Sequence, residues 1–329
     1  MPGFVNAHSH LSLSALKGKI RLGNGVLDFS KQIMENREKI KEKDMIKKAK
    51  EEINYAFSRG TFFYNDICND SFFIDFLRNI KNFQGYRFFE ILGFNTKRAE
   101  ENIKIVEEVM GYDAKIFPTP HSYYGSSPQI MSFVREFARF TTMSIHLFET
   151  IDEIEFAYER GKTFEFLRTM GLYEKYTKIF NIYLLDYLNS MGMFSFKKLI
   201  LVHLVHAMKK DLEYLEKIIP HAAWVLCHRS NENIGEIRKN WELLQKTPIR
   251  LLLGTDSAAS SPDVSILDEI YAVYKTGFFS ESMLFRAATF SAYEYLEIPQ
   301  SRVPFFIFPN AKPNIESIAS IKKAYLLKG

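Results

Sequence analysis

Cysteine and long apolar runs are scarce in this sequence. Its 329 residues include two cysteines, Cys68 and Cys227, which lie too far apart in the chain to suggest a disulfide framework. A reduced, cytoplasmic setting is therefore expected. The longest apolar stretches, such as residues 199–205 and 249–253, have the length of strands and are too short to cross a membrane. The first residues lack the basic and apolar segments of a secretory signal peptide, so none is expected.

An excess of charge of one sign is also missing. The chain has 43 basic and 39 acidic residues, a formal net charge of +4, and no stretch of basic residues stands out. Nucleic acid is therefore not an expected partner. The charged residues between positions 35 and 52 are interpreted as the solvated face of a helix, because apolar residues recur there at helical spacing, as at Ile46, Ala49 and Ile53.

Short β-rich runs alternate with helical patterns along the whole chain. Helices are predicted, among other places, at residues 98–110, 130–140, 211–219 and 264–276. Eight strands alternating with helices predict an α/β fold in which a parallel sheet closes as a (β/α)8 TIM barrel. The predicted strands are residues 4–7, 61–65, 87–92, 114–118, 142–145, 199–202, 223–226 and 250–253.

No internal repeat and no linker rich in glycine and serine divides the chain. The predicted organisation is one (β/α)8 barrel over residues 1–300, followed by a C-terminal tail over residues 301–329. Two short apolar runs in this tail, residues 305–308 and 324–327, predict a small β appendage.

Histidines gather where the predicted strands end. Only His221 of the eight histidines falls elsewhere in the sequence. Because a TIM barrel bears its active site at the C-terminal ends of its strands, this clustering predicts a functional site. The seven histidines that follow strand ends are His8, His10, His121, His146, His203, His206 and His228.

Four of these strand-end residues have the types and spacing of metal ligands. His8 and His10 lie two positions apart on one strand, so their side chains point to the same side and can share one ion. His146 after the fifth strand and Asp256 after the eighth would complete a set of three imidazoles and one carboxylate. This set suits zinc and leaves one position open for water.

Around these residues the sequence resembles the amidohydrolase superfamily, in particular its branch of chlorohydrolases and ring deaminases, such as guanine, S-adenosylhomocysteine and aminofutalosine deaminases. The matching segments follow the family order over nearly the whole chain. They are Pro2-Gly3 through Leu11, Gly60-Thr61, Pro120-His121-Ser122, His146 through Thr150, Val202 through His206, Arg229-Ser230-Asn231 and Leu253 through Ser257, with Leu267 and Glu269 downstream.

The resemblance implies a role for each residue of the site. Glu149 would be the general acid/base, His203 would help to activate water, and His121 would contact the substrate. Asp256 would take a proton from that water in addition to binding metal. One divalent ion, zinc or alternatively iron, would be held by His8, His10, His146 and Asp256.

The chain departs from the family pattern at several points. Family members usually have a further segment before the Pro-Gly that forms half of a β-sandwich, so here this flanking sandwich is expected to be reduced or absent, with the tail as its remnant. His228 replaces the usual proline before Arg-Ser-Asn; whether its ring faces the site is left open, and His206 is interpreted as a supporting histidine. Lys115 would matter in a two-metal site, but the one-metal pattern fits better.

The predicted function is hydrolytic deamination of a small aminated heterocycle: a purine, a nucleoside or a related ring. Residues 11–28 and 123–128 are expected to line the pocket. The alternatives are a dechlorinase or amide hydrolase of the same fold, or a non-catalytic metal-binding remnant. Neither membrane nor nucleic acid is an expected partner, and a homodimer is an assembly that is common in families of this kind.

Overall fold

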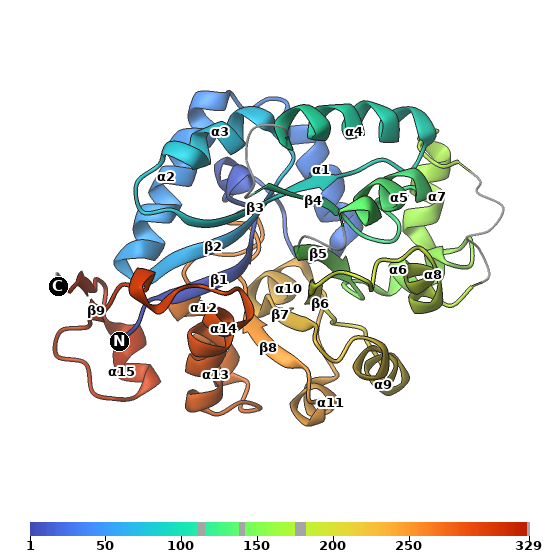
Figure 1. Cartoon of the computed structure of the whole chain (residues 1–329). Helices are drawn as coiled ribbons and strands as arrows, with labels where there is room; N and C mark the ends of the chain where they lie inside the picture. The colour runs from blue at the N-terminus through green and yellow to red at the C-terminus, as the bar shows by residue number, and fades with distance from the viewer. Residues whose placement is uncertain (111–115, 138–141, 175–181, 328–329) are drawn as a thin grey trace.

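Eight parallel strands form the centre of the molecule (Figure 1). The computed structural model describes residues 1–110, 116–137, 142–174 and 182–327. Its central strands are β1 (Phe4–Ser9), β2 (Thr61–Cys68), β3 (Gln84–Ile91), β4 (Ile116–Pro120), β5 (Thr142–Leu147), β6 (Lys198–His203), β7 (Ala223–Leu226) and β8 (Arg250–Leu253).

The strands pair in two parallel sheets, in the orders β1-β2-β3-β4 and β5-β6-β7-β8. The sheets meet at both edges. Between β4 and β5, the backbone N–H of His146 donates to the carbonyl of His121 at 3.1 Å. Between β8 and β1, the N–H groups of Thr255 and Asp256 both donate to the carbonyl of His8, at 3.0 and 3.1 Å. The sheet therefore closes, and the predicted (β/α)8 barrel is confirmed.

Gly254 allows β8 to approach β1 at this junction. A Cβ atom at Gly254 would lie 2.9 Å from both the Cβ and the carbonyl oxygen of His8. Any larger residue would push the two strands apart, which explains the glycine between the apolar strand and Asp256.

Helices surround the strands (Figure 1). Short 3-10 helices lie at η1 (Leu11–Leu16) and η2 (Gln300–Arg302). The α-helices are α1 (Val26–Arg37), α2 (Glu42–Ser58), α3 (Ser71–Asn79), α4 (Thr96–Met110), α5 (Pro128–Glu136), α6 (Ile151–Phe156), α7 (Gly161–Thr169), α8 (Leu184–Ser190), α9 (Lys209–Ile218), α10 (His228–Ile234), α11 (Trp241–Lys246), α12 (Ile266–Lys275), α13 (Glu281–Ala288), α14 (Phe290–Tyr295) and α15 (Ile315–Ser320).

The predicted elements agree with the observed ones, apart from their ends. Several strands run further than predicted: β2 continues beyond residue 65 through the fully buried Asp66 to Cys68. The charged stretch 35–52 is not one helix, since it spans the end of α1 and much of α2, with a break at 38–41. The first residues of the predicted strand 114–118 and the last of the predicted helix 130–140 lie outside the described residues.

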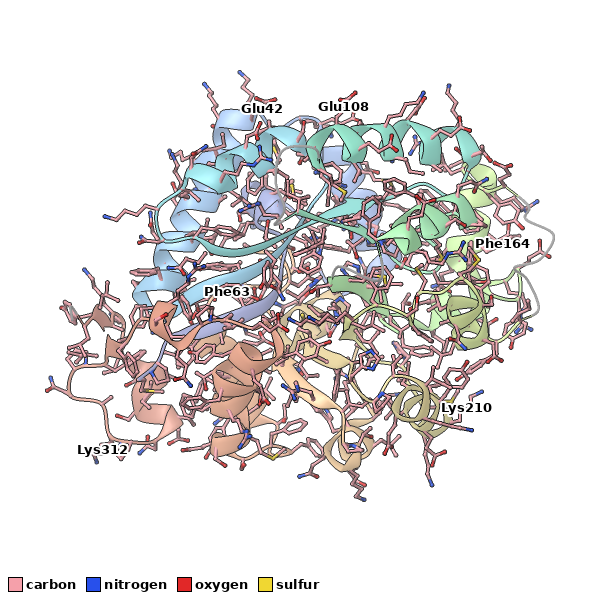
Figure 2. The ribbon with its side chains drawn as sticks, viewed as in Figure 1. Glu42, Phe63, Glu108, Phe164, Lys210 and Lys312 are labelled. Carbon is pink, nitrogen blue, oxygen red and sulfur yellow. The ribbon has the colours of Figure 1, made fainter. Side chains whose placement is uncertain are left out.

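Apolar side chains fill the barrel and the layer between strands and helices. Val5, Val202 and Val225 are among the buried residues of the barrel interior. Figure 2 shows charged side chains such as Glu42 and Lys210 pointing outward, whereas Phe63 and other large apolar groups lie within. None of the helices that the structure describes is long and apolar enough to cross a lipid bilayer.

The C-terminal tail forms the predicted β appendage. Strands β9 (Phe306–Ile307) and β10 (Tyr325–Leu326) pair in antiparallel fashion. The appendage lies beside the N-terminus, since Pro2 bridges to Phe305 (Figure 1).

Candidate metal centre and active site

The histidines at the strand ends converge at the C-terminal mouth of the barrel. The ring centroid of His8 lies 4.9 Å from those of His10 and His146, and 5.8 Å from that of His203. Nε2 of His10 faces Nε2 of His146 at 3.3 Å, and Oδ1 of Asp256 lies 3.7 Å from Nε2 of His10. The structure therefore brings together all four residues that were predicted as ligands.

The donor set fits a divalent metal ion. Both ring nitrogens of His8 are buried, and neither has a hydrogen-bond partner among the residues described. Buried polar atoms without partners are rare, so these two nitrogens indicate that His8 is available to bind a metal ion. Burial lowers the pKa of His8 and of His146 well below the ordinary value, which keeps both rings neutral and able to coordinate. Imidazole and carboxylate ligands suit zinc and also iron.

Neighbouring groups orient these side chains. Nδ1 of His146 lies 2.9 Å from the carbonyl oxygen of His121, which leaves Nε2 directed at the cluster. Ser230 Oγ donates to Oδ2 of Asp256 at 2.6 Å, so Oδ1 remains turned toward His10. Contacts of this kind fix ligand geometry in metal sites.

Glu149 and His203 lie beside the predicted metal ligands, and their side chains are of the types that transfer protons. Oε1 of Glu149 lies 3.4 Å from Nε2 of His203, and ligand atoms of both residues lie within 4.8 Å of the Asp256 carboxylate. Burial, and then the nearby Asp256 carboxylate, raises the pKa of Glu149 well above its ordinary value. Burial lowers the pKa of His203 to about 4. A carboxyl whose environment favours the protonated form and an imidazole whose environment favours the neutral form therefore face each other next to the cluster.

The backbone adopts left-handed conformations where these side chains begin. Phe148, His203, Leu204 and Asp256 have φ values of 51°, 77°, 51° and 59°. Each such residue costs about 1–3 kcal/mol relative to ordinary backbone and persists only where its surroundings hold it. The backbone thus bends away from strand geometry at or just after the ends of β5, β6 and β8: at His203, at Asp256 and directly before Glu149.

Sequence reasoning missed Glu90, at the end of β3. Its Oε1 lies 2.7 Å from Nδ1 of His121 and 3.7 Å from Nδ1 of His146. Burial alone would lower the pKa of His121, but the Glu90 carboxylate outweighs it and raises that pKa. The available signal was a single carboxylate inside the apolar run of residues 88–92.

Other singled-out residues lie away from the cluster. His206 pairs with Glu236 at 2.8 Å, and His228 packs edge-on against Trp241 with a ring separation of 5.2 Å. His221 is exposed, with Nε2 3.3 Å from the carbonyl oxygen of Phe196. Lys115 lies outside the described residues.

A cavity of about 320 Å³ opens over the cluster. Helix α1 contributes Val26, Phe29, Ile33 and Met34 to its lining, and the candidate site contributes Glu90, His10, His121, His146, Glu149 and Asp256. As predicted, part of segment 11–28 contributes to the lining, but α1 contributes more.

A second cavity of about 150 Å³ adjoins the first, and we call it the annexe. The two cavities share lining residues, including Met34, Arg98 and His121. The remaining wall of the annexe is mainly apolar, with Phe94, Leu167 and further side chains of α7 and the loop after β4.

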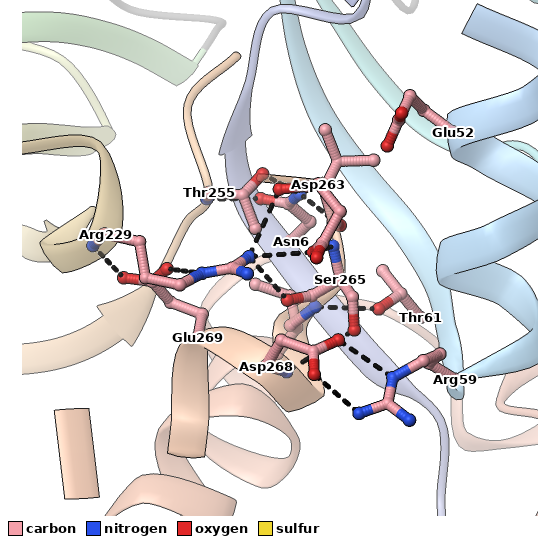
Figure 3. A network of polar contacts seen from close by, with 12 residues as sticks. Asn6, Glu52, Arg59, Thr61, Arg229, Thr255, Asp263, Ser265, Asp268 and Glu269 are labelled. Carbon is pink, nitrogen blue, oxygen red and sulfur yellow. Dashed lines mark hydrogen bonds and ion pairs between the residues drawn. The ribbon is translucent and has the colours of Figure 1, made fainter. Parts of the chain in front are cut away.

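A buried network holds the elements behind the cluster (Figure 3). Nε of Arg229 donates to Glu269 at 2.8 Å, and its Nη2 donates to Asp263 at 2.9 Å. Asn6 Nδ2 donates to Oγ1 of Thr255 at 2.8 Å. The two bonds of Arg229 join α10 to α12 and to the segment before it, and the bond of Asn6 joins β1 to the segment after β8. These elements contribute Ser230 and Asp256.

Comparison with known proteins gives related sequences and structures. The 5'-deoxyadenosine deaminase of Methanococcus maripaludis is 24% identical over 290 residues, covering 83% of this chain and 62% of that protein. The 5-methylthioadenosine/S-adenosylhomocysteine deaminase of Thermococcus sibiricus is 29% identical over 174 residues, covering 51% and 35%. The chain spans about three-fifths of the length of the first of these relatives.

Solved structures share the fold. Helicobacter pylori aminofutalosine deaminase in complex with methylthio-coformycin superposes with a TM-score of 0.80 at 20% identity, over 99% of this chain and 84% of that one. Guanine deaminase of E. coli gives a TM-score of 0.72 at 16% identity, over 99% and 84%. The sequence model of the amidohydrolase family matches residues 1–301. This match covers most of the chain, and the chain therefore belongs to the amidohydrolase family.

Proposed function

We propose that this chain is a metal-dependent hydrolase that removes the amino group of a small aminated heterocycle, such as a purine nucleoside. The observation that carries the proposal is the position of Glu149: a buried carboxyl 3.4 Å from His203, beside the cluster and open to the cavity. Deamination of a ring needs a proton donor at that place, in addition to activated water.

We assign the metal to His8, His10, His146 and Asp256, with zinc as the expected ion and iron as the alternative. An ion bound there lowers the pKa of water to about 7 and so supplies hydroxide at neutral pH.

The chain's own residues then handle protons. Glu149, whose pKa burial raises well above its ordinary value, donates a proton to a ring nitrogen of the substrate, which makes the amino-bearing carbon more electrophilic. The Asp256 carboxylate accepts the proton of the attacking water. His203, neutral and buried, donates a hydrogen bond to the oxygen that develops charge on that carbon. The proton held by Asp256 then passes to the amino group, the bond between the ring carbon and this nitrogen breaks, and ammonia leaves, while the Glu149 carboxylate takes up the hydroxyl proton of the intermediate, so that both residues regain their starting states.

His121 and the annexe would position the substrate. His121 is held by Glu90 and lines both cavities, so it lies where the ring and its substituent would join. The apolar wall of the annexe suits a substituent without charge. Relatives named for 5'-deoxyadenosine and 5-methylthioadenosine act on nucleosides of that kind, and this supports such a nucleoside as the substrate.

We further propose that residues 1–300 are the catalytic barrel and residues 301–329 an appendage to it. A cytoplasmic setting is supported by the free thiols of Cys68 and Cys227.

Two measurements test the function together. Bound metal per chain is determined by elemental analysis on protein purified without chelator, and ammonia release is followed with 5'-deoxyadenosine, 5-methylthioadenosine and guanine. About one equivalent of metal, lost in a His8→Ala/His10→Ala variant, with ammonia release from one of these rings, is the expected result. Metal without ammonia would redirect the assignment to a dechlorinase or amide hydrolase. A chain that takes up neither zinc nor iron would be a non-catalytic remnant.

A further inference from the structure

A buried arginine lies directly behind His203. Arg238, in the segment between α10 and α11, has only 5% of its surface exposed. Its Nη2 donates to the carbonyl oxygen of His203 at 2.5 Å, and its Nη1 donates to that of Leu204 at 3.0 Å. These are the two residues with left-handed backbone at the end of β6. One guanidinium therefore binds both carbonyls of this turn.

The surroundings of Arg238 are unusual for a buried cation. None of the ion pairs within the described part of the chain links it to a carboxylate, and burial lowers its pKa to about 9, so it remains charged at neutral pH. Its guanidinium carbon lies 5.5 Å from the ring centroid of Trp224 and 5.2 Å from that of Trp241. These are the two tryptophans of the sequence. Aromatic faces and carbonyl oxygens thus compensate the lost hydration.

Other groups bind the same turn. Nε1 of Trp224 donates to the His203 carbonyl at 3.2 Å. Nδ2 of Asn240 donates to the carbonyls of Leu204 and Ala207, at 3.0 and 2.7 Å. An ordinary apolar side chain could fill this space without burying a charge. The presence of Arg238 therefore indicates that its N–H groups are needed to bind these carbonyls.

We propose that Arg238 is a positioning residue for His203. By holding the two carbonyls, it fixes the left-handed turn after β6, and this turn directs Nε2 of His203 toward Glu149. Without the guanidinium, both carbonyls would lose a charge-assisted bond in a buried place, and the backbone would relax toward negative φ. The His203 ring would then rotate away from Glu149. The consequence for turnover rests on the role proposed above for His203.

Three variants separate the parts of this arrangement. Arg238→Met removes charge and donors but keeps the apolar stem, Arg238→Lys keeps the charge with fewer fixed donors, and Trp224→Phe removes one donor to the same carbonyl. Arg59→Met is the control for the loss of a buried arginine; unlike Arg238, Arg59 also forms an ion pair with a carboxylate, that of Asp268. Arg59 is also 5% exposed and also donates to backbone carbonyls, those of Ala319 and Ile321, but it lies where α2 ends, just before β2 begins.

The readouts are kcat and KM, bound metal, thermal unfolding, and the ¹⁵N signals of the His203 ring, assigned with a His203→Gln variant. We expect Arg238→Met to lower kcat about tenfold or more while KM changes little, because small displacements of a reacting group are costly. The His203 signals should shift, bound metal should stay constant, and Arg238→Lys should recover part of kcat. Arg59→Met should lose stability but keep kcat and the His203 signals.

Unchanged His203 signals in Arg238→Met, or a fall in kcat no larger than in Arg59→Met, would overturn the proposal. If Arg238→Met does not fold, the same comparison is made with Arg238→Lys and Trp224→Phe. Should the wild-type protein release no ammonia, the proposed function fails, yet the His203 signals still decide whether Arg238 orients the ring.

Discussion

The carboxylate of Glu90 lies 2.7 Å from Nδ1 of His121 and closes one side of the candidate active site. This pair joins β3 to the residue after β4, next to the predicted metal ligands. Since the carboxylate accepts from Nδ1, the other ring nitrogen of His121 is available to a bound molecule.

A Glu90→Gln substitution should therefore weaken substrate binding more than it slows chemistry. The amide keeps the size of the side chain but removes the charge that raises the pKa of His121, so this pKa should fall. We expect KM to increase about tenfold with a smaller change in kcat. Steady-state kinetics between pH 5 and pH 8 would measure both. An unchanged KM would exclude His121 from substrate contact.

Glu149→Gln should abolish turnover without loss of metal. The amide is nearly the same size but cannot donate and take back a proton, and Glu149 is not among the predicted ligands. Elemental analysis and ammonia release on the same preparation provide the measurement, and His146→Ala, which should lose metal, is the comparison. Loss of metal in Glu149→Gln would make this residue a ligand.

Ser230→Ala should weaken metal binding. It removes the 2.6 Å hydrogen bond that holds Oδ2 of Asp256. Loss of such a supporting bond typically costs about 10–100-fold in metal affinity, measurable by competition with a chromophoric chelator. Ser261→Ala is the control, because the buried Ser261 hydroxyl has no partner among the residues described. Equal affinities in the two variants would contradict the orienting role of Ser230.

Glu153 should make folding stability depend on pH. Burial raises its pKa from 4.5 to about 8. Between these values the unfolded chain releases a proton that the folded chain retains, so the stability from this group is full below pH 4.5 and falls as the pH rises to 8. Glu153→Gln should thus raise Tm more at pH 8 than at pH 5, whereas Glu100→Gln, at an exposed position, should not. A gain independent of pH would refute this account.

Leu167→Lys should weaken the binding of substrates that carry a substituent in the annexe and leave the binding of the bare ring unchanged. Leu167 lines the annexe but not the cavity over the cluster, so a cation there should raise KM for 5'-deoxyadenosine and leave that for adenine nearly unchanged. Met170→Lys, at a 59% exposed position just after α7, is the control. Equal effects of Leu167→Lys on both substrates would mean that the annexe does not bind the substituent.

Much of the fold could be predicted because barrel strands are short apolar runs with sharp ends. β7 and β8 begin and end at the predicted residues. The predicted ligands could be found because histidines and one aspartate interrupt the pattern directly after those runs. Such signals are local, because the residue type and its position after a strand are enough to reveal them.

The remaining parts depend on contacts between distant segments. Glu90 sits within an apolar strand, and only its distance to His121 distinguishes it from a structural carboxylate. The sequence of α1 has the pattern of an ordinary amphipathic helix, yet its residues line the cavity. Arg238 lies 35 positions from His203, and no spacing rule connects them.

The two junctions that close the barrel are made by residues of the candidate site. One is bonded through His8 and Asp256, and the other through His121 and His146. An ion bound by His8, Asp256 and His146 would link the two four-stranded halves of the barrel. Metal binding could then be measured without an activity assay, as slower amide hydrogen exchange at the β8–β1 and β4–β5 junctions. A substitution among these residues would weaken the closure of the barrel as well as the proposed chemistry.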